Sequence, residues 1–238
     1  MSKQLLFLDT ETTGNMPEDR LCQLCYKLGD TIVSELYKPA IPIKIDSMAV
    51  HHITNEMVKD APAFAGSKEA HDLQKLFADG AVFVAHNAKF DISMLEKEGL
   101  KPEAVIDTYR VARYLDADGK IPSYRLQYLR YFLGIVIDAT AHDAKGDVLV
   151  LEQLFERLIS KIMETQDISR DEAIDRMIDI SSRPCLFKSI NFGKYKGSLV
   201  TDVAVKDPGS LKWLLDEKRK TPEDEEDWIY TLEKSLNV

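Results

Sequence analysis

Cysteine is scarce in this sequence: its 238 residues include only Cys22, Cys25 and Cys185. The first two have the C-x-x-C spacing of some zinc sites, but no second cysteine pair exists to complete such a site. In an extended strand their thiols would also point to opposite faces. We therefore interpret all three as packed thiols in a reducing compartment, which excludes a disulfide-rich secreted protein.

Long apolar runs are lacking as well, because no run approaches the roughly 18 residues that predict a membrane span. The N-terminal sequence MSKQLLFLDT leads directly into a predicted strand, so we expect no cleavable signal peptide. The length suits one large domain and one small one, and the 45% apolar content is ordinary for a globular protein. These features predict a cytoplasmic protein with no membrane partner.

Positive charge is in deficit, with 31 Lys and Arg against 40 Asp and Glu, a net charge of −9. Such a deficit argues against a nucleic-acid partner, because phosphate contacts supply much of the affinity for nucleic acids. The charge is uneven, however. Residues 183–220 contain nine Lys or Arg and four Asp or Glu, a net of +5. A nucleic-acid partner is therefore compatible with the composition.

Carboxylates follow directly after an apolar strand near the N-terminus. Residues 5–8 read Leu-Leu-Phe-Leu, which predicts a buried strand, and Asp9 and Glu11 come next. Two residues apart on a strand, these carboxylates share a face. Residues 12–14 then form a predicted turn whose backbone amides could approach a substrate.

Two further segments place polar residues in similar positions. After the predicted strand 81–85, Asn87 is a candidate helix N-cap, and Asp91 falls in the first turns of that helix. This is the carboxyl edge of the sheet, where open α/β folds bind ligands. His142 and Asp147 would lie roughly 140° apart on one helix. We therefore place His142 on a loop and Asp147 near the start of the following helix.

Together these segments supply four carboxylates and one imidazole. A carboxylate cluster stays ionised at neutral pH only where cations neutralise it, and oxygen ligands suit Mg²⁺ or Mn²⁺. Each residue alone has an ordinary alternative, such as a solvated helix aspartate or a surface histidine. The ordered occurrence of all three segments favours two-metal phosphodiester hydrolysis by Asp9, Glu11, Asp91, His142 and Asp147.

The motifs resemble those of the DEDDh exonucleases, which have the ribonuclease-H-like fold. The three family motifs are matched by DTETTG at 9–14, HNAKFD at 86–91, and His142 with Asp147. The segment 50–54, VHHIT, looks like the family's Val-His-Gly-Ile-Thr segment near the terminal nucleotide, with His52 in place of the glycine.

The C-terminal part also resembles this family. Residues 178–184 (IDISSRP), 192–197 (FGKYKG) and 207–214 (DPGSLKWL) look like the C-terminal region of its exodeoxyribonuclease X group. The resemblance therefore spans nearly the whole chain. It implies a metal-dependent 3′→5′ exonuclease that releases 5′-mononucleotides from single-stranded or duplex DNA 3′ ends, in DNA repair, without an obligate protein partner.

The resemblance also implies roles for the five residues. Two Mg²⁺ ions, replaceable by Mn²⁺, would be held with Asp9 bridging both, Glu11 and Asp147 completing one site, and Asp91 holding the other. His142 would be the general base. The expected substrate contacts are Thr12, Thr13, Gly14, Met16, His51, Ile53, Asn87, Phe90, Lys194 and Lys196.

Some of these contacts have alternatives. Met16 is interpreted either as a wedge against the terminal base, in a pocket with His51 and Phe90, or as an ordinary loop methionine. The run 192–197 either stacks and neutralises single-stranded nucleic acid or forms a tight hairpin with its aromatic rings packed inward. We expect Trp213, among leucines, to lie in a helix core.

Two other functions stay open. One is a 3′→5′ exoribonuclease or proofreading-type exonuclease subunit with the same site, since hydrolysis alone does not select the sugar. The other is an inactive nucleic-acid-binding subunit, against which the intact set of five residues argues.

The expected fold is α/β: a ribonuclease-H-like mixed central sheet flanked by helices, with a small C-terminal module. The expected parts are the exonuclease domain 1–165, a connecting helix within 166–184, and the module 185–238. Strands are predicted near 4–10, 20–28, 31–38, 81–86 and 104–107. Helices are predicted near 66–78, 88–98, 108–116, 124–133, 146–164, 169–179, 208–218 and 222–236.

Overall fold

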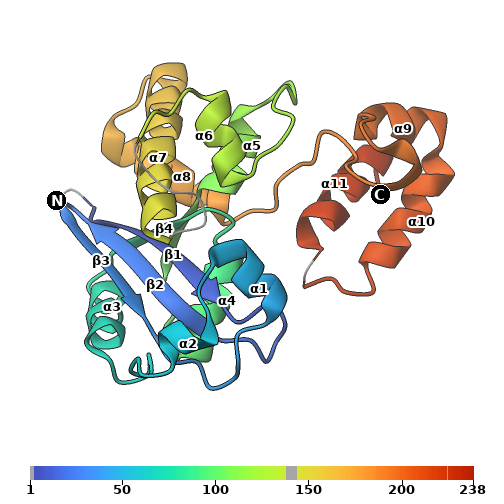
Figure 1. Ribbon diagram of the computed structural model, residues 1–238. Coiled ribbons are helices and arrows are strands. Elements are labelled where there is room, and N and C mark those ends of the chain that lie inside the picture. Colours follow the sequence, from blue (N-terminus) through green and yellow to red (C-terminus); the bar gives the residue numbers. More distant parts are fainter. Residues whose placement is uncertain (1–2, 138–143, 224) are drawn as a thin grey trace.

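A five-stranded mixed sheet forms the centre of the larger body of the protein, on the left in Figure 1. The computed structural model describes residues 3–137, 144–223 and 225–238. The strand order is β3-β2-β1-β4-β5, with β1 antiparallel to β2 and parallel to β4. The strands are β1 (Leu5–Thr12), β2 (Leu21–Leu28), β3 (Thr31–Leu36), β4 (Val82–Ala85) and β5 (Ala104–Asp107). The predicted mixed sheet flanked by helices is therefore confirmed.

The side chains of β1 alternate between two hydrophobic cores, as the pleat of a strand requires. Phe7 faces the core formed with one group of helices: α5 (Thr108–Leu115), α6 (Leu126–Phe132), α7 (Ala144–Gln166) and α8 (Arg170–Ser181). Leu6 and Leu8 face the other core, formed with α3 (Lys68–Ala78) and α4 (Lys89–Lys97). The helix within the expected connecting segment thus shares the first core, through Ile174 and Met177.

Two short helices not expected from the sequence lie between β3 and α3. They are α1 (Ile45–His51) and α2 (Asn55–Val58). The Asn55 side chain accepts from the Ile43 amide at 2.8 Å and donates to the Ile43 carbonyl at 3.2 Å. Such short helices depend on tertiary bonds of this kind, because isolated helices of this length are unstable in water.

The C-terminal module has a hydrophobic core of its own. It contains the short 3-10 helix η1 (Gly193–Tyr195) and the helices α9 (Val200–Lys206), α10 (Pro208–Lys218) and α11 (Glu226–Leu236). Buried Val200, Leu211, Trp228 and Leu232 form the centre of this core. In Figure 1 the module lies to the right of the body, joined to it by an extended segment after α8.

The expectation that Trp213 lies in a helix core is wrong, because this side chain is 64% exposed. Leu211, Leu214 and Leu215 form the buried face of α10 at positions i, i+3 and i+4. Trp213 is rotated about 200° from Leu211, which places it on the opposite face. Trp228 on α11 is the tryptophan that packs in the module core.

Among the described residues, no helix is both long and apolar enough to cross a membrane.

Candidate active site

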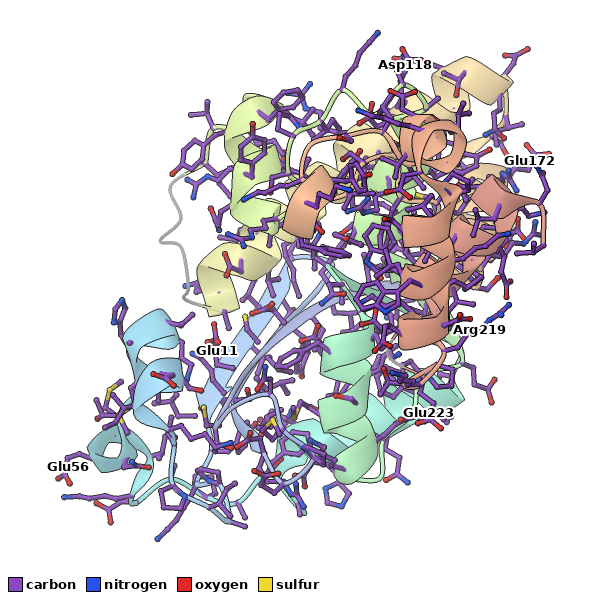
Figure 2. The ribbon with its side chains drawn as sticks, turned by 90° about the vertical axis from the view of Figure 1, so that its right-hand side faces the viewer. Glu11, Glu56, Asp118, Glu172, Arg219 and Glu223 are labelled. Carbon is purple, nitrogen blue, oxygen red and sulfur yellow. The ribbon has the colours of Figure 1, made fainter. Side chains whose placement is uncertain are left out.

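Three of the predicted metal ligands converge at one edge of the sheet. Asp9 and Glu11 lie on β1 and Asp147 lies in the first turn of α7. One ligand oxygen from each lies within 4.8 Å of the other two. Figure 2 shows Glu11 just below the start of α7. These carboxylates are half-buried, so the cluster is accessible from solvent.

The packing of α7 on β1 brings these residues together. The rings of Phe7 and Phe155 meet edge to face with centroids 5.3 Å apart, which fixes the helix against the strand. Glu11 lies four residues beyond Phe7, or about 13 Å along a strand. Asp147 lies eight residues before Phe155, or about 12 Å along a helix. Because these two distances are nearly equal, the Glu11 and Asp147 carboxylates come together about 12–13 Å from the Phe7–Phe155 contact.

A hydrogen-bond chain from α6 holds Asp147. The Gln127 side-chain amide donates to Asp147 Oδ1. Arg130 Nη1 in turn donates to Gln127 Oε1 at 3.3 Å, and Arg130 Nη2 donates to the Ile137 carbonyl at 2.7 Å. Gln127 therefore orients the carboxylate from behind, a contact that the sequence did not predict.

Asp91 joins the edge from α4. Its Oδ1 accepts hydrogen bonds from the Thr10 amide at 3.0 Å and the Thr10 hydroxyl at 2.7 Å. The described pairing of β4 with β1 ends at Phe7. Beyond that point, Asp91 rather than a neighbouring strand accepts the hydrogen bond from the Thr10 backbone amide. It is buried at 3% exposure and is not one of the three clustered ligands. The prediction that Asp91 lies in the first turn of a helix at this edge is confirmed.

The electrostatics of this edge fit a divalent cation. Burial raises the pKa of Asp91 above its ordinary value, in spite of the hydrogen bonds from Thr10, and the nearby Asp107 carboxylate raises it further. A cation at the edge would favour the ionised carboxylates. Clustered carboxylate oxygens are also the donors that hard divalent cations prefer. Asp9, Glu11 and Asp147 can therefore hold such an ion.

The predicted general base, His142, lies outside the described residues. Asp147 itself falls in the first turn of α7, as the sequence predicted.

Asn87 was expected to be the N-cap of α4, and this is wrong: the N-cap residue is Ala88. Asn87 has a left-handed backbone conformation, with φ of 63°, and its backbone N–H donates to Asp107 Oδ1 at 2.9 Å. Burial raises the pKa of Asp107 to about 6, although its bonds from backbone amides favour the ionised form. The Asn87 side chain is exposed, and its contact with substrate is still a prediction.

The turn after β1 is held by a buried carboxylate, Asp19. It accepts hydrogen bonds from the Thr13 hydroxyl, the Met16 amide and Lys44, each at 2.7 Å. A Cβ added at Gly14 would lie 2.4 Å from the Asp19 carboxylate, so only glycine fits there. The Thr13 amide donates to the Arg20 carbonyl at 2.8 Å, which commits it to the turn itself.

His51 supports the same turn from α1. Its Nε2 donates to the Thr12 carbonyl at 3.1 Å and its Nδ1 accepts from the Ile53 amide at 3.0 Å. Burial lowers the pKa of this imidazole, which keeps it neutral. His52, in the place of the family glycine, takes the left-handed conformation that glycine favours, with φ of 62°. The backbone path of this segment thus tolerates the substitution.

The remaining predicted contacts differ in exposure. Met16 is 51% exposed at the turn, whereas Ile53 is 5% exposed and packs in a small core. Phe90, near the start of α4, is half-buried. The proposed pocket of Met16, His51 and Phe90 stays a prediction.

The aromatic rings of the run 192–197 contact other residues of the module, although Phe192 is 38% exposed. Phe192 meets Trp228 edge to face at 5.3 Å, and the Tyr195 hydroxyl donates to Asp207 at 2.6 Å. This packing favours the tight-turn interpretation of the run. Lys194 and Lys196 are exposed, and Lys194 lies 3.4 Å from Asp207.

Sequence reasoning missed Gln127 and Asp19 because nothing in the sequence separates them from surface polar residues. Both act through contacts that only the folded chain creates.

Comparison with known proteins agrees with this geometry. Residues 6–155 match the family model described as "Exonuclease". "Exodeoxyribonuclease 10" of Escherichia coli (strain K12) is 33% identical over 182 residues, 76% of each chain. "DNA polymerase III subunit epsilon" of Treponema pallidum (strain Nichols) is 33% identical over 165 residues, 64% of this chain and 74% of the relative.

Solved structures show the same fold. The structure of "Exonuclease X in complex with 5' overhanging duplex DNA" has a TM-score of 0.57 and 25% identity. The matched region covers 73% of this chain and 99% of the Exonuclease X chain. E. coli Exonuclease I in complex with a dT13 oligonucleotide has a TM-score of 0.59 and 20% identity, over 70% of this chain and 43% of its own.

Proposed function

Because the chain belongs to the exonuclease family, we propose that it is a metal-dependent 3′→5′ exodeoxyribonuclease that releases 5′-mononucleotides from DNA 3′ ends. The observation that carries the proposal is the convergence of Asp9, Glu11 and Asp147 within 4.8 Å at the sheet edge. The choice of DNA is supported by the deoxyribonuclease relative and by the DNA-bound Exonuclease X.

In this proposal Asp9, Glu11, Asp91 and Asp147 hold two Mg²⁺ ions, for which Mn²⁺ can substitute. Bound divalent ions supply a nucleophile at neutral pH and neutralise charge on the phosphate and leaving oxygen. Thr10 fixes Asp91, and Gln127 fixes Asp147, so the ligand oxygens are oriented before the substrate arrives.

His142 is proposed to accept the proton that the attacking water loses. The stretch that carries it follows directly after Ile137, whose carbonyl is held by Arg130. Arg130 therefore contacts both Gln127, which orients Asp147, and Ile137, which lies five residues before His142 in the sequence.

The test is the digestion of 5′-labelled single-stranded DNA, duplex DNA and matched RNA with Mg²⁺, using Asp9→Asn and the control Asp30→Asn. Asp30 is an exposed residue at the β2–β3 turn, so Asp30→Asn makes the same chemical change as Asp9→Asn outside the carboxylate cluster. We expect stepwise shortening of DNA from its 3′ end, lost in Asp9→Asn and kept in Asp30→Asn. The loss should exceed about 10³-fold, because several metal contacts loosen together.

Two other results of the digestion assay would change the proposal. Preference for RNA would make the protein an exoribonuclease. Activity that survives in Asp9→Asn would contradict the proposed site. Isothermal titration with Mg²⁺ complements the assay, since Asp9→Asn should lose the metal binding that Asp30→Asn retains.

A further inference from the structure

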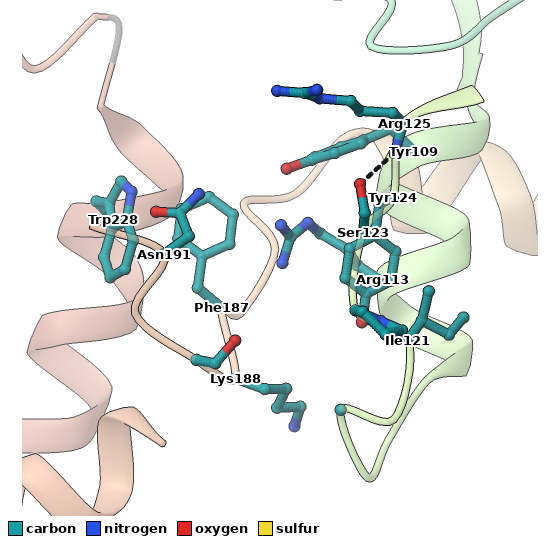
Figure 3. A pocket seen from close by; sticks show the side chains of 13 residues that line it. Tyr109, Arg113, Ile121, Ser123, Tyr124, Arg125, Phe187, Lys188, Asn191 and Trp228 are labelled. Atoms are coloured by element: carbon teal, nitrogen blue, oxygen red, sulfur yellow. Dashed lines mark hydrogen bonds between the residues drawn. The ribbon is translucent and has the colours of Figure 1, made fainter. Parts of the chain in front are cut away.

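A cavity separates the C-terminal module from the exonuclease body, and its volume is about 460 Å³. One wall comes from α5 and the loop before α6, and the other comes from residues 187–191 and α11. Figure 3 shows Phe187, Asn191 and Trp228 facing Tyr109, Arg113 and Arg125 across this space. None of these residues belongs to the metal-ligand cluster.

The charge of the cavity is opposite to that of the protein. Its lining contains three cations, Arg113, Arg125 and Lys188, and no Asp or Glu. In the part of the chain that the structure describes, no salt bridge involves any of these three cations. A cavity lined in this way within a chain of net charge −9 favours an anionic ligand.

Arg113 is held by rings rather than by carboxylates. Its guanidinium lies over Tyr109, Tyr124 and Phe187, with centroid distances of 4.8, 4.2 and 4.5 Å. Its buried Nε has no hydrogen-bond partner among the described residues. The cavity thus combines a guanidinium fixed among aromatic rings with two further cationic side chains, Arg125 and Lys188.

This combination fits a nucleotide. Aromatic rings and arginine stack on a base, and cationic side chains bind its phosphate. An inorganic anion would leave the aromatic wall unused, and an apolar ligand would leave the three cations unneutralised. The volume accommodates about one nucleotide, since binding sites for small ligands begin near 300 Å³.

The cavity is physically connected to the active-site edge. The Tyr124 carbonyl accepts a hydrogen bond at 2.7 Å from His86, which follows β4 directly. Two residues after Arg125, Gln127 contacts Asp147. One short segment therefore forms part of the cavity wall at its start and orients a metal ligand at its end.

We propose that this cavity is a second nucleotide-binding site, in which the aromatic wall stacks on one base while Arg125 and Lys188 bind its phosphate. The nucleotide comes either from the substrate strand or from the released mononucleotide, and this choice rests on the proposed function. Binding itself does not rest on it.

The test uses the fluorescence of Trp228. The chain has two tryptophans, so Trp213→Phe leaves Trp228 as the only one. In this background, with Asp9→Asn and EDTA, dTMP and a short oligothymidylate are titrated. We expect saturable quenching, with Kd raised about 100-fold in Arg125→Gln/Lys188→Gln, since each lost charged contact costs about tenfold in affinity. The control Lys75→Gln/Lys101→Gln removes equal charge from exposed sites and should leave Kd unchanged.

Comparison of dTMP with the oligothymidylate shows which of the two origins of the nucleotide is correct. Tighter binding of dTMP than of the oligonucleotide identifies the free mononucleotide as the ligand, whereas tighter binding of the oligonucleotide identifies the substrate strand. The proposal is overturned if neither ligand quenches the fluorescence, or if Kd is the same with and without Arg125→Gln/Lys188→Gln in the Trp213→Phe/Asp9→Asn background. Nuclease activity is measured separately on the protein with Asp9 intact, so loss of one function is not mistaken for loss of the other.

Discussion

At the scale of single residues, the site depends on side chains that orient the ligands as well as on the ligands. Gln127 is the strongest example, because its amide contacts Asp147 while Arg130 holds its carbonyl oxygen. Partners of this kind typically contribute 10- to 100-fold, in round terms about 1–3 kcal/mol, to metal affinity or activity.

We predict that Gln127→Ala lowers the exonuclease rate by about 10- to 100-fold and raises the Mg²⁺ concentration needed for half-maximal rate. Gln74→Ala, on the exposed surface of α3, is the control. Rates measured across a Mg²⁺ series check this. A slower Gln127→Ala enzyme with unchanged Mg²⁺ dependence would show that Gln127 does not act through the metal ligand.

His52 offers a prediction about stability. Its left-handed backbone at the end of α1 is strained for any residue except glycine, and its amide still donates to the Met48 carbonyl at 2.8 Å. His52→Gly should raise the free energy of unfolding by about 1 kcal/mol, while His52→Ala should not. Chemical denaturation of the three proteins measures this, and equal stability of the Gly and Ala variants would contradict it.

At the scale of elements, His86 ties β4 to the segment before α6. Its Nδ1 lies 2.9 Å from the Thr108 hydroxyl, and its Nε2 donates to the Tyr124 carbonyl. Burial lowers the pKa of His86 to about 4, from about 6.5 in the unfolded chain. The unfolded chain therefore binds more protons between these values.

The sign of the pH effect follows from this difference. The contribution of neutral His86 is fully present above pH 6.5 and is lost as the pH falls towards 4, up to about 3 kcal/mol. We predict that His86→Gln, whose amide can still donate to Tyr124, loses less stability over this interval than the wild type. Urea unfolding in EDTA at several pH values measures the difference, and parallel curves would refute it.

The elements that the sequence predicted are those with strong periodicity. All five strands and the long helices follow from apolar patterns, and Asp9, Glu11, Asp91 and Asp147 take their places from these elements. The helices α1, α2 and α9 were missed because segments of four to seven residues carry little periodic signal, and the seven-residue α6 was predicted only within the longer range 124–133. Gln127 was missed because its contact depends on how α6 packs beside α7.

At the scale of the whole molecule, Arg110 joins the body to the C-terminal module. It forms salt bridges with Glu226 and with Asp227, the latter at 3.3 Å, and it donates to the carbonyls of Ser181 and Arg183 at 3.0 Å each. Asp227 also accepts from the Cys185 amide at 2.8 Å. The connecting segment is thus pinned from both sides.

We predict that Arg110→Gln speeds proteolysis within residues 182–188 by about tenfold, because loss of these bonds makes opening easier by about 1.5 kcal/mol. The control is Arg157→Gln, an exposed residue of α7. Limited digestion followed by mass spectrometry of the fragments checks the position and the rate. Equal cleavage of the two variants would show that Arg110 does not hold the segment.

The carboxylate cluster draws on residues 9 and 11 and on residue 147, so most of the body separates its members along the chain. During synthesis on a ribosome, the first two ligands emerge early and the third emerges only after all five strands of the sheet. Until α7 packs on β1, the growing chain holds no complete cluster. The ligand cluster of the proposed nuclease therefore stays incomplete on the nascent polypeptide until α7 has been made and has packed on β1.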